Sequence, residues 1–137
     1  MPKQTYDKVL DLVFDAVEKR GYTEGYTNEE LVVRQAVKAV EELSELLSAL
    51  EVQGGGSRIN EARFNVMRGK LMEAAQWARE LFDDKASCKS IKIAGRDDFA
   101  RELCDVLIPC HVAQAILDVG QAEVLGKARG DIGRGVR

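Results

Sequence analysis

Several residue types that mark common protein classes are scarce in this chain of 137 residues. It has two prolines and one tryptophan, and aromatic residues make up 6% of the total, which favours helices over a β-sandwich or barrel. The three cysteines are odd in number and show no Cys-x-x-Cys spacing. This usage predicts reduced thiols in a cytoplasmic protein.

Long apolar runs and an excess of positive charge are also missing. No stretch approaches the roughly 20 apolar residues that cross a bilayer. The first residues carry acids inside their apolar stretch and offer no small-residue cleavage site, which argues against a signal peptide. The net charge is −3, so there is no basic footprint for nucleic acid. We therefore expect neither a membrane nor a nucleic-acid partner.

What the chain does contain is apolar residues at helical spacing, broken by glycine-rich segments. The predicted helices cover about 5–19, 28–52, 57–83, 97–117 and 121–128. Thr27 or Asn28 is expected to cap the second helix and Ser57 the third. The pattern predicts an all-α fold, a bundle of four to five helices in a single domain over residues 1–137.

Three segments are less regular. The polar linker 84–95 contains Ile91 and Ile93, which alternate like a very short strand. Pro109 interrupts the fourth helix, and this predicts a kink or an earlier helix end. The tail 130–137 is rich in glycine and is predicted to be flexible.

Two of the predicted helices carry acids in the same relation to their apolar face. The predicted core rows are Ala39, Leu43, Leu46 and Leu50 on the second helix, and Phe99, Leu103, Val106 and Cys110 on the fourth. Glu42 and Glu45 occupy the row beside the first of these, and Glu102 and Asp105 the row beside the second. If the two apolar rows pack together, four carboxylates converge.

Four converging anions cannot all stay ionised in a partly dry groove without a cation. Carboxylates alone, with no imidazole or thiolate, suit Mg²⁺ or Mn²⁺. Such an ion stabilises a phosphate oxygen and activates an attacking water. A di-iron carboxylate bundle is excluded, because it needs two Glu-x-x-His motifs and the chain has one histidine. A single acidic pair usually means a solvated helix face, but two matched pairs favour a metal site.

The stretches "EELSE" (41–45) and "ELCD" (102–105), the second followed by "VLI", resemble the marks of the MazG-like all-α nucleoside triphosphate pyrophosphohydrolases. The resemblance implies a MazG-like bundle that cleaves an NTP or dNTP to the monophosphate and pyrophosphate. It also implies that Glu42, Glu45, Glu102 and Asp105 hold Mg²⁺. Glu41 would be the catalytic group that orients the attacking water, or a further ligand.

The family often contacts phosphates through a Lys, an Asn and a basic residue after the second acidic motif. Lys127, Asp131 and Arg134 match best, with Asp131 in the place of the asparagine. Lys38, the base nearest the acids, is a further predicted substrate contact. Another departure is the long gap between the acidic motifs, which holds the predicted helix 57–83. Trp77 or Phe64 on that helix is expected to pack in a core or, as an alternative, to stack on a base.

Such proteins are typically homodimers or homotetramers, so we expect a homo-oligomer. Within the same superfamily, a dUTPase-like or phosphoribosyl-ATP-cleaving activity is an alternative that the acidic motifs do not distinguish. From a different class, a helical binding or regulatory module without turnover remains a second hypothesis. A third is a structural oligomer whose acids only solvate a seam.

Overall fold

The structure is a computed structural model that describes residues 5–19, 21 and 23–133. These residues form six helices and no strand, which confirms the predicted all-α class. The helices are α1 (Thr5–Lys19), α2 (Asn28–Ser48), α3 (Arg58–Asp83), α4 (Lys85–Ser90), α5 (Arg96–Leu117) and α6 (Gln121–Gly133). No single described helix is long and apolar enough to cross a membrane, and α5 with the first ten residues of α6 meets that test only as a bent pair.

The helix ends follow local capping chemistry where the sequence supplies it. Thr27 caps α2 in a capping box, in which its hydroxyl accepts from the backbone N–H of Glu30 and the Glu30 carboxylate accepts from the N–H of Thr27. Ser57 caps α3 by accepting from the N–H of Asn60 at 3.3 Å. Helix α2 ends at Ser48, four residues before the predicted end.

The three less regular segments compare with the predictions as follows in the described residues. The linker 84–95 contains the short helix α4, capped by Asp84, and Ile91 follows it without forming a strand. Pro109 lies inside α5, so the helix does not end early there, and the predicted kink stays a prediction. Helix α6 runs to Gly133, so the first part of the predicted flexible tail is helical, while 134–137 lie outside the described residues.

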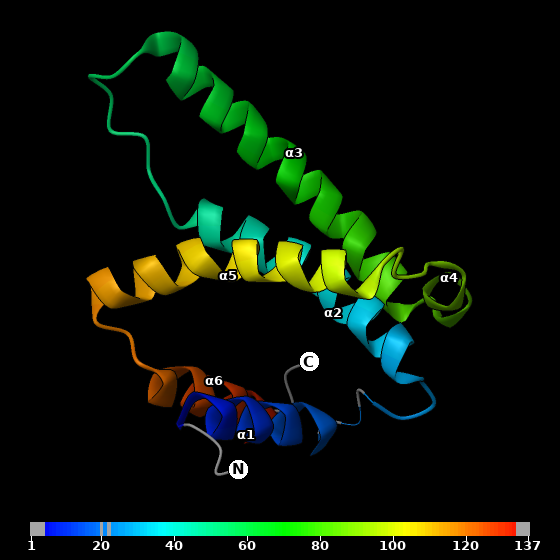
Figure 1. The fold of residues 1–137 in the computed structure, drawn as a ribbon. Coiled ribbons are helices and arrows are strands. Elements are labelled where there is room, and N and C mark those ends of the chain that lie inside the picture. Colours follow the sequence, from blue (N-terminus) through cyan, green and yellow to red (C-terminus); the bar gives the residue numbers. More distant parts are fainter. Residues whose placement is uncertain (1–4, 20, 22, 134–137) are drawn as a thin grey trace. The chain divides into compact units, whose positions relative to one another are not determined.

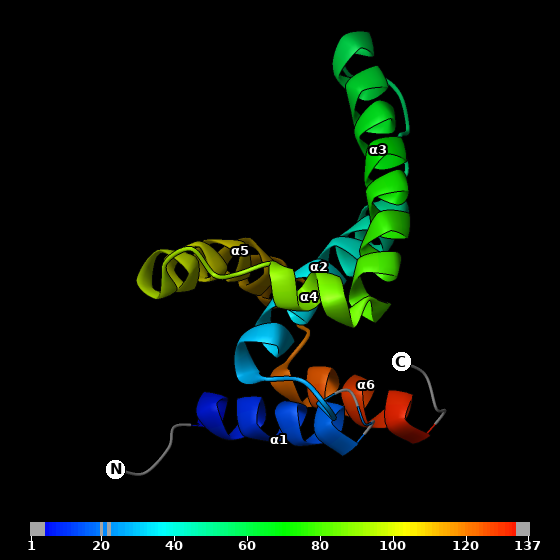
Figure 2. The same cartoon turned by 90° about the vertical axis from the view of Figure 1, so that its right-hand side faces the viewer.

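The described helices group into two compact units, one of α2, α3 and α4 and one of α1, α5 and α6. In the second group, α1 and α6 lie side by side, as Figures 1 and 2 both show, and Ala16 of α1 is buried. Whether the whole chain acts as one domain stays a prediction.

The core of the α2–α4 unit is small and contains buried polar groups. Its buried apolar residues are Val33, Ala75, Ala78, Phe82 and Cys88. Arg34 is buried beside them, where its Nε–H donates to the backbone oxygen of Phe82 at 3.1 Å and its guanidinium lies 4.0 Å from the centre of the Phe82 ring. This pairing satisfies a charge that would otherwise be costly to bury.

Helices α2 and α3 meet near α4 and separate toward the loop that joins them (Figure 1). Ala75 and Ala78 have small side chains at the contact, so the two helix backbones can approach closely there. Further from α4, the Arg68 side chain of α3 donates to the backbone oxygen of Leu50, just past the end of α2. A groove lined by residues of both helices lies between α2 and α3.

The predicted core rows of α2 and α5 are exposed except for the half-buried Phe99, which corrects the sequence-based assignment. Leu46 is 60% exposed and Val106 is 59% exposed. The face of α2 that contacts α3 instead carries Val33, Arg34 and Ser44. Helix α2 has apolar residues on two faces, and its own unit uses only one of them. Helix α5 has no buried residue among those described.

Candidate functional site

The three acids of "EELSE" on α2 have different surroundings. Glu41 accepts from Lys38 Nζ at 3.0 Å and from Arg79 Nε of α3 at 3.1 Å. Glu42 lies 3.6 Å from the same Lys38 Nζ and has a more exposed side chain. Glu41 therefore ties α2 to α3, whereas Glu42 shares one cation with its neighbour.

The pKa values of Glu41 and Glu42 move in opposite directions. Partial burial pushes the pKa of Glu41 upward, but the hydrogen bonds and charges of Lys38 and Arg79 outweigh it and leave the pKa lowered. Partial burial also raises the pKa of Glu42, and the nearby charge of Glu45 raises it further, against the opposing effect of Lys38. The charged form of Glu42 is therefore destabilised by its surroundings, and a bound proton or a nearby cation would relieve this.

Glu102 and Asp105 lie exposed on α5, and the apolar residues around them are also exposed. These two acids belong to the unit of α1, α5 and α6, whereas Glu42 and Glu45 belong to the unit of α2, α3 and α4. Each pair is therefore defined within its own unit, and the convergence of the four carboxylates stays a prediction.

The donor set suits a hard cation but is incomplete within either unit. Across residues 5–19, 21 and 23–133, no group of three or more His, Cys, Asp and Glu side chains is placed to hold a metal ion. Glu42 and Glu45 supply only carboxylate oxygens, which fit Mg²⁺ in kind. As a pair they would leave most of its positions to water, substrate or further acids.

The predicted substrate contacts fall on two helices. Lys38 is half-buried on α2 and is held by Glu41 and Glu42. Lys127 is exposed on α6, and the backbone of Asp131 belongs to the same helix. Arg134 lies outside the described residues. Their contact with phosphate stays a prediction.

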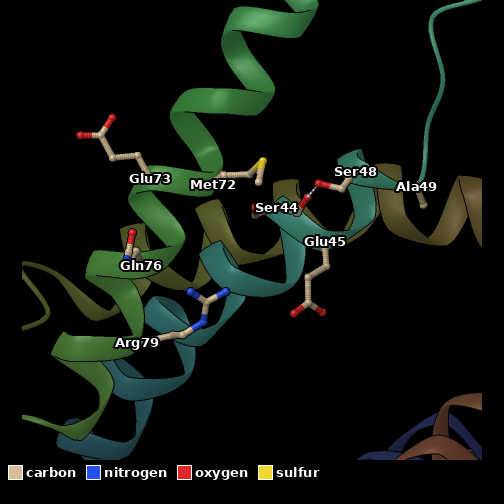
Figure 3. Close-up of a pocket in the computed structure, with 8 residues that line it drawn as sticks. All are labelled: Ser44, Glu45, Ser48, Ala49, Met72, Glu73, Gln76 and Arg79. Atoms are coloured by element: carbon tan, nitrogen blue, oxygen red, sulfur yellow. Dashed lines mark hydrogen bonds between the residues drawn. The ribbon is translucent and has the colours of Figure 1, made fainter.

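A groove of about 710 Å³ lies between α2 and α3, close to the acids. Its walls consist of Ser44, Glu45, Ser48 and Ala49 from α2, and Met72, Glu73, Gln76 and Arg79 from α3. Figure 3 shows Arg79 extending from α3 toward α2, while the Glu73 carboxylate points away from α2. Glu45 therefore belongs both to the acidic pair and to the groove.

Sequence reasoning did not identify Ser44, Gln76 or Arg79, because their role depends on which faces of α2 and α3 meet. The two aromatic residues considered for base stacking lie elsewhere. Trp77 is exposed, and the half-buried Phe64 has the Arg68 guanidinium 4.9 Å from its ring centre. Trp77 therefore does not contribute to the core of its own unit.

Comparison with known proteins gives no relative from which a function can be transferred: no family model, no curated protein and no solved structure matches this chain.

Proposed function

We propose that this protein is a Mg²⁺-dependent nucleoside triphosphate pyrophosphohydrolase that releases a monophosphate and pyrophosphate. The observation that carries the proposal is the Glu42 and Glu45 pair. Burial and the nearby charge of Glu45 raise the pKa of Glu42, and Lys38, which lies 3.6 Å from Glu42, lies closer to Glu41 at 3.0 Å. A divalent cation at this pair would relieve the repulsion.

The exposed apolar rows support the second half of the proposed site. Leu43 and Leu46 on α2, and Leu103 and Val106 on α5, are all exposed next to the acidic pairs. Within its own unit, each row is left uncovered, so it is available to pack against another helix. Packing of one against the other, within a chain or between two copies, would bring Glu102 and Asp105 to Glu42 and Glu45. Packing between two copies would also account for the expected homo-oligomer.

In the proposed site, Glu42, Glu45, Glu102 and Asp105 hold the ion, which when bound stabilises charge on a phosphate oxygen and activates water. Glu41 is suited to orient the attacking water, because its lowered pKa keeps it ionised as a hydrogen-bond acceptor. Lys38 places a positive charge beside Glu41 and Glu42, where it can attract the substrate phosphates. Lys127, Asp131 and Arg134 are proposed phosphate contacts from the C-terminal segment.

The test is direct. The purified protein is incubated with each common NTP and dNTP in Mg²⁺, and monophosphate and pyrophosphate are quantified. We expect release from at least one nucleotide, and loss of that release in Glu42→Gln and Asp105→Asn with an unchanged helical circular dichroism spectrum. Absence of both turnover and calorimetric Mg²⁺ binding would refute the proposal and favour a non-catalytic helical module.

A further inference from the structure

The groove between α2 and α3 contains a buried polar group without a partner. Ser44 is 6% exposed and lines the groove. Its backbone oxygen accepts from Ser48 Oγ at 2.9 Å, but its own hydroxyl makes no hydrogen bond within the described part of the chain. Buried hydroxyls are nearly always satisfied in native proteins. An unsatisfied one facing a groove points to a ligand or an ordered water.

Arg79 offers a second donor group in the same groove. Its Nε–H is used by Glu41 at 3.1 Å, which fixes the plane of the guanidinium. The outer Nη groups make no other hydrogen bond or ion pair with the described residues, and the side chain is 53% exposed. A planar fork held at one edge and open at the other is suited to two parallel hydrogen bonds to a phosphate.

The charges of the groove indicate which anion it would accept. Two acids, Glu45 and Glu73, line it together with the single base Arg79. Free phosphate would be repelled by the two carboxylates, whereas a phosphate chelated by a divalent cation would not. Glu45 belongs to the proposed metal pair, so such a cation would lie at the edge of the groove. The donors Arg79 and Ser44 would then face the phosphate oxygens.

From these contacts we propose that the α2–α3 groove binds the polyphosphate of a Mg²⁺-chelated nucleotide, with Arg79 and the Ser44 hydroxyl donating to its oxygens. The inference rests on the proposed function for the identity of the nucleotide. In this proposal α3, the helix between the two acidic motifs in the sequence, contributes Arg79 to the binding site. The volume of about 710 Å³ is within the range of small-molecule sites, so the groove has room for more than one phosphate group.

The experiment is calorimetric titration of the full chain with inorganic pyrophosphate, with and without Mg²⁺. We expect binding only with Mg²⁺, weakened about tenfold or more in Arg79→Gln and about threefold to tenfold in Ser44→Ala. Arg63→Gln is the matched control, because Arg63 lies on the same helix outside the groove and its variant has the same charge change. It should bind like the wild type.

Stability separates a binding role from a structural one. Arg79→Gln also breaks the ion pair with Glu41, so its weaker binding alone would be ambiguous. Ser44→Ala removes an unpaired buried hydroxyl and adds a better helix former, so it should leave urea stability unchanged or higher while it weakens binding. If the wild type shows no pyrophosphate binding, or if both variants bind like the wild type, the groove proposal is wrong.

The outcomes for the groove and for the enzyme are distinguishable. Turnover by the wild type with an unchanged KM in Arg79→Gln and Ser44→Ala would refute the groove and leave the pyrophosphohydrolase proposal intact. Pyrophosphate binding that depends on Mg²⁺, Arg79 and Ser44 in a protein without turnover would support the groove and favour a non-catalytic binding module over the enzyme.

Discussion

Neutralising the adjacent acids Glu41 and Glu42 should change stability in opposite directions. Glu41→Gln removes a carboxylate that is 16% exposed and bonded to Lys38 and Arg79 at 3.0 and 3.1 Å. Hydrogen bonds to charged groups contribute about 1.5–3 kcal/mol when well shielded, but the exposure of Arg79 reduces this. We expect the variant to lose about 1 kcal/mol at pH 7, which corresponds to a decrease of roughly 3–5 °C in Tm for a chain of this size.

Glu42→Gln should instead stabilise the protein without metal. Like charges three residues apart on a helix repel by about 0.2–0.5 kcal/mol, and the Gln variant relieves the repulsion with Glu45. The side chain of Glu42 is 59% exposed, so solvent screening keeps the gain at that level. The two substitutions each remove one negative charge from neighbouring positions, and they therefore control for net charge.

The pH dependence follows from the two pKa directions. The pKa of Glu42 is raised on folding, so its charge destabilises the fold above the folded pKa, and this penalty disappears below the ordinary value of 4.5. The pKa of Glu41 is lowered, so its contribution is complete above 4.5 and is lost as the pH falls through the folded pKa. The difference in unfolding free energy between each variant and the wild type should therefore become smaller when the pH is lowered from 7 toward 4.

Urea denaturation followed by circular dichroism, at pH 7 and pH 4 in low salt, measures both variants. A loss of stability in Glu41→Gln with a small gain in Glu42→Gln is the expected result at pH 7. If both variants shift the midpoint in the same direction, the assignment of Glu41 to a stabilising ion pair and of Glu42 to a repulsive pair is wrong.

Two further substitutions test the core and the exposed rows. Arg34→Met leaves the buried backbone oxygen of Phe82 without this donor, so urea unfolding should show a loss of about 2 kcal/mol or more, whereas an unchanged midpoint would contradict its structural role. Val106→Lys should cost less than about 0.5 kcal/mol if the residue is exposed in solution, and should lower the mass measured by sedimentation equilibrium if the row is an interface. A wild-type protein that is monomeric with and without Mg²⁺ would refute the interface.

The helix ends were predictable where a local side chain marks them. Thr27 and Ser57 cap α2 and α3 through hydrogen bonds to residues three positions ahead, so the sequence alone contains the signal. Helix α4 was not predicted, because its six residues are too few for an apolar period. The burial of Cys88 within it arises from contacts with α2 and α3.

The face that each helix buries was harder to predict than its ends. Helix α2 has apolar residues on two faces, and periodicity identified the row of Leu43 and Leu46, whereas its own unit buries Val33 with Arg34 and Ser44. The choice depends on contacts with α3, which no local pattern records. The same contacts pair Arg79 with Glu41, so both the groove and the different environments of the acids required the structure.

The exposed surface of α5 gives a physical reason why the acidic pairs should not act alone. Leu103, Val106, Ile108, Val112 and Ile116 are each at least 49% exposed. Of these, Leu103 and Val106 lie in the row beside the acids, and burying the exposed part of each would contribute about 1 kcal/mol.

A surface that covers the row beside Glu102 and Asp105 must also accommodate their two charges. The exposed row of α2 is likewise flanked by two acids, Glu42 and Glu45. Packing the two rows together would bring four carboxylates close to one another, and a cation would be needed to neutralise their repulsion. Packing of α5 should therefore be coupled to divalent metal: Mg²⁺ should protect its amides from hydrogen exchange in the wild type and protect them less in Asp105→Asn. Equal protection of α5 with and without Mg²⁺ would show that the acids and the apolar rows serve separate purposes.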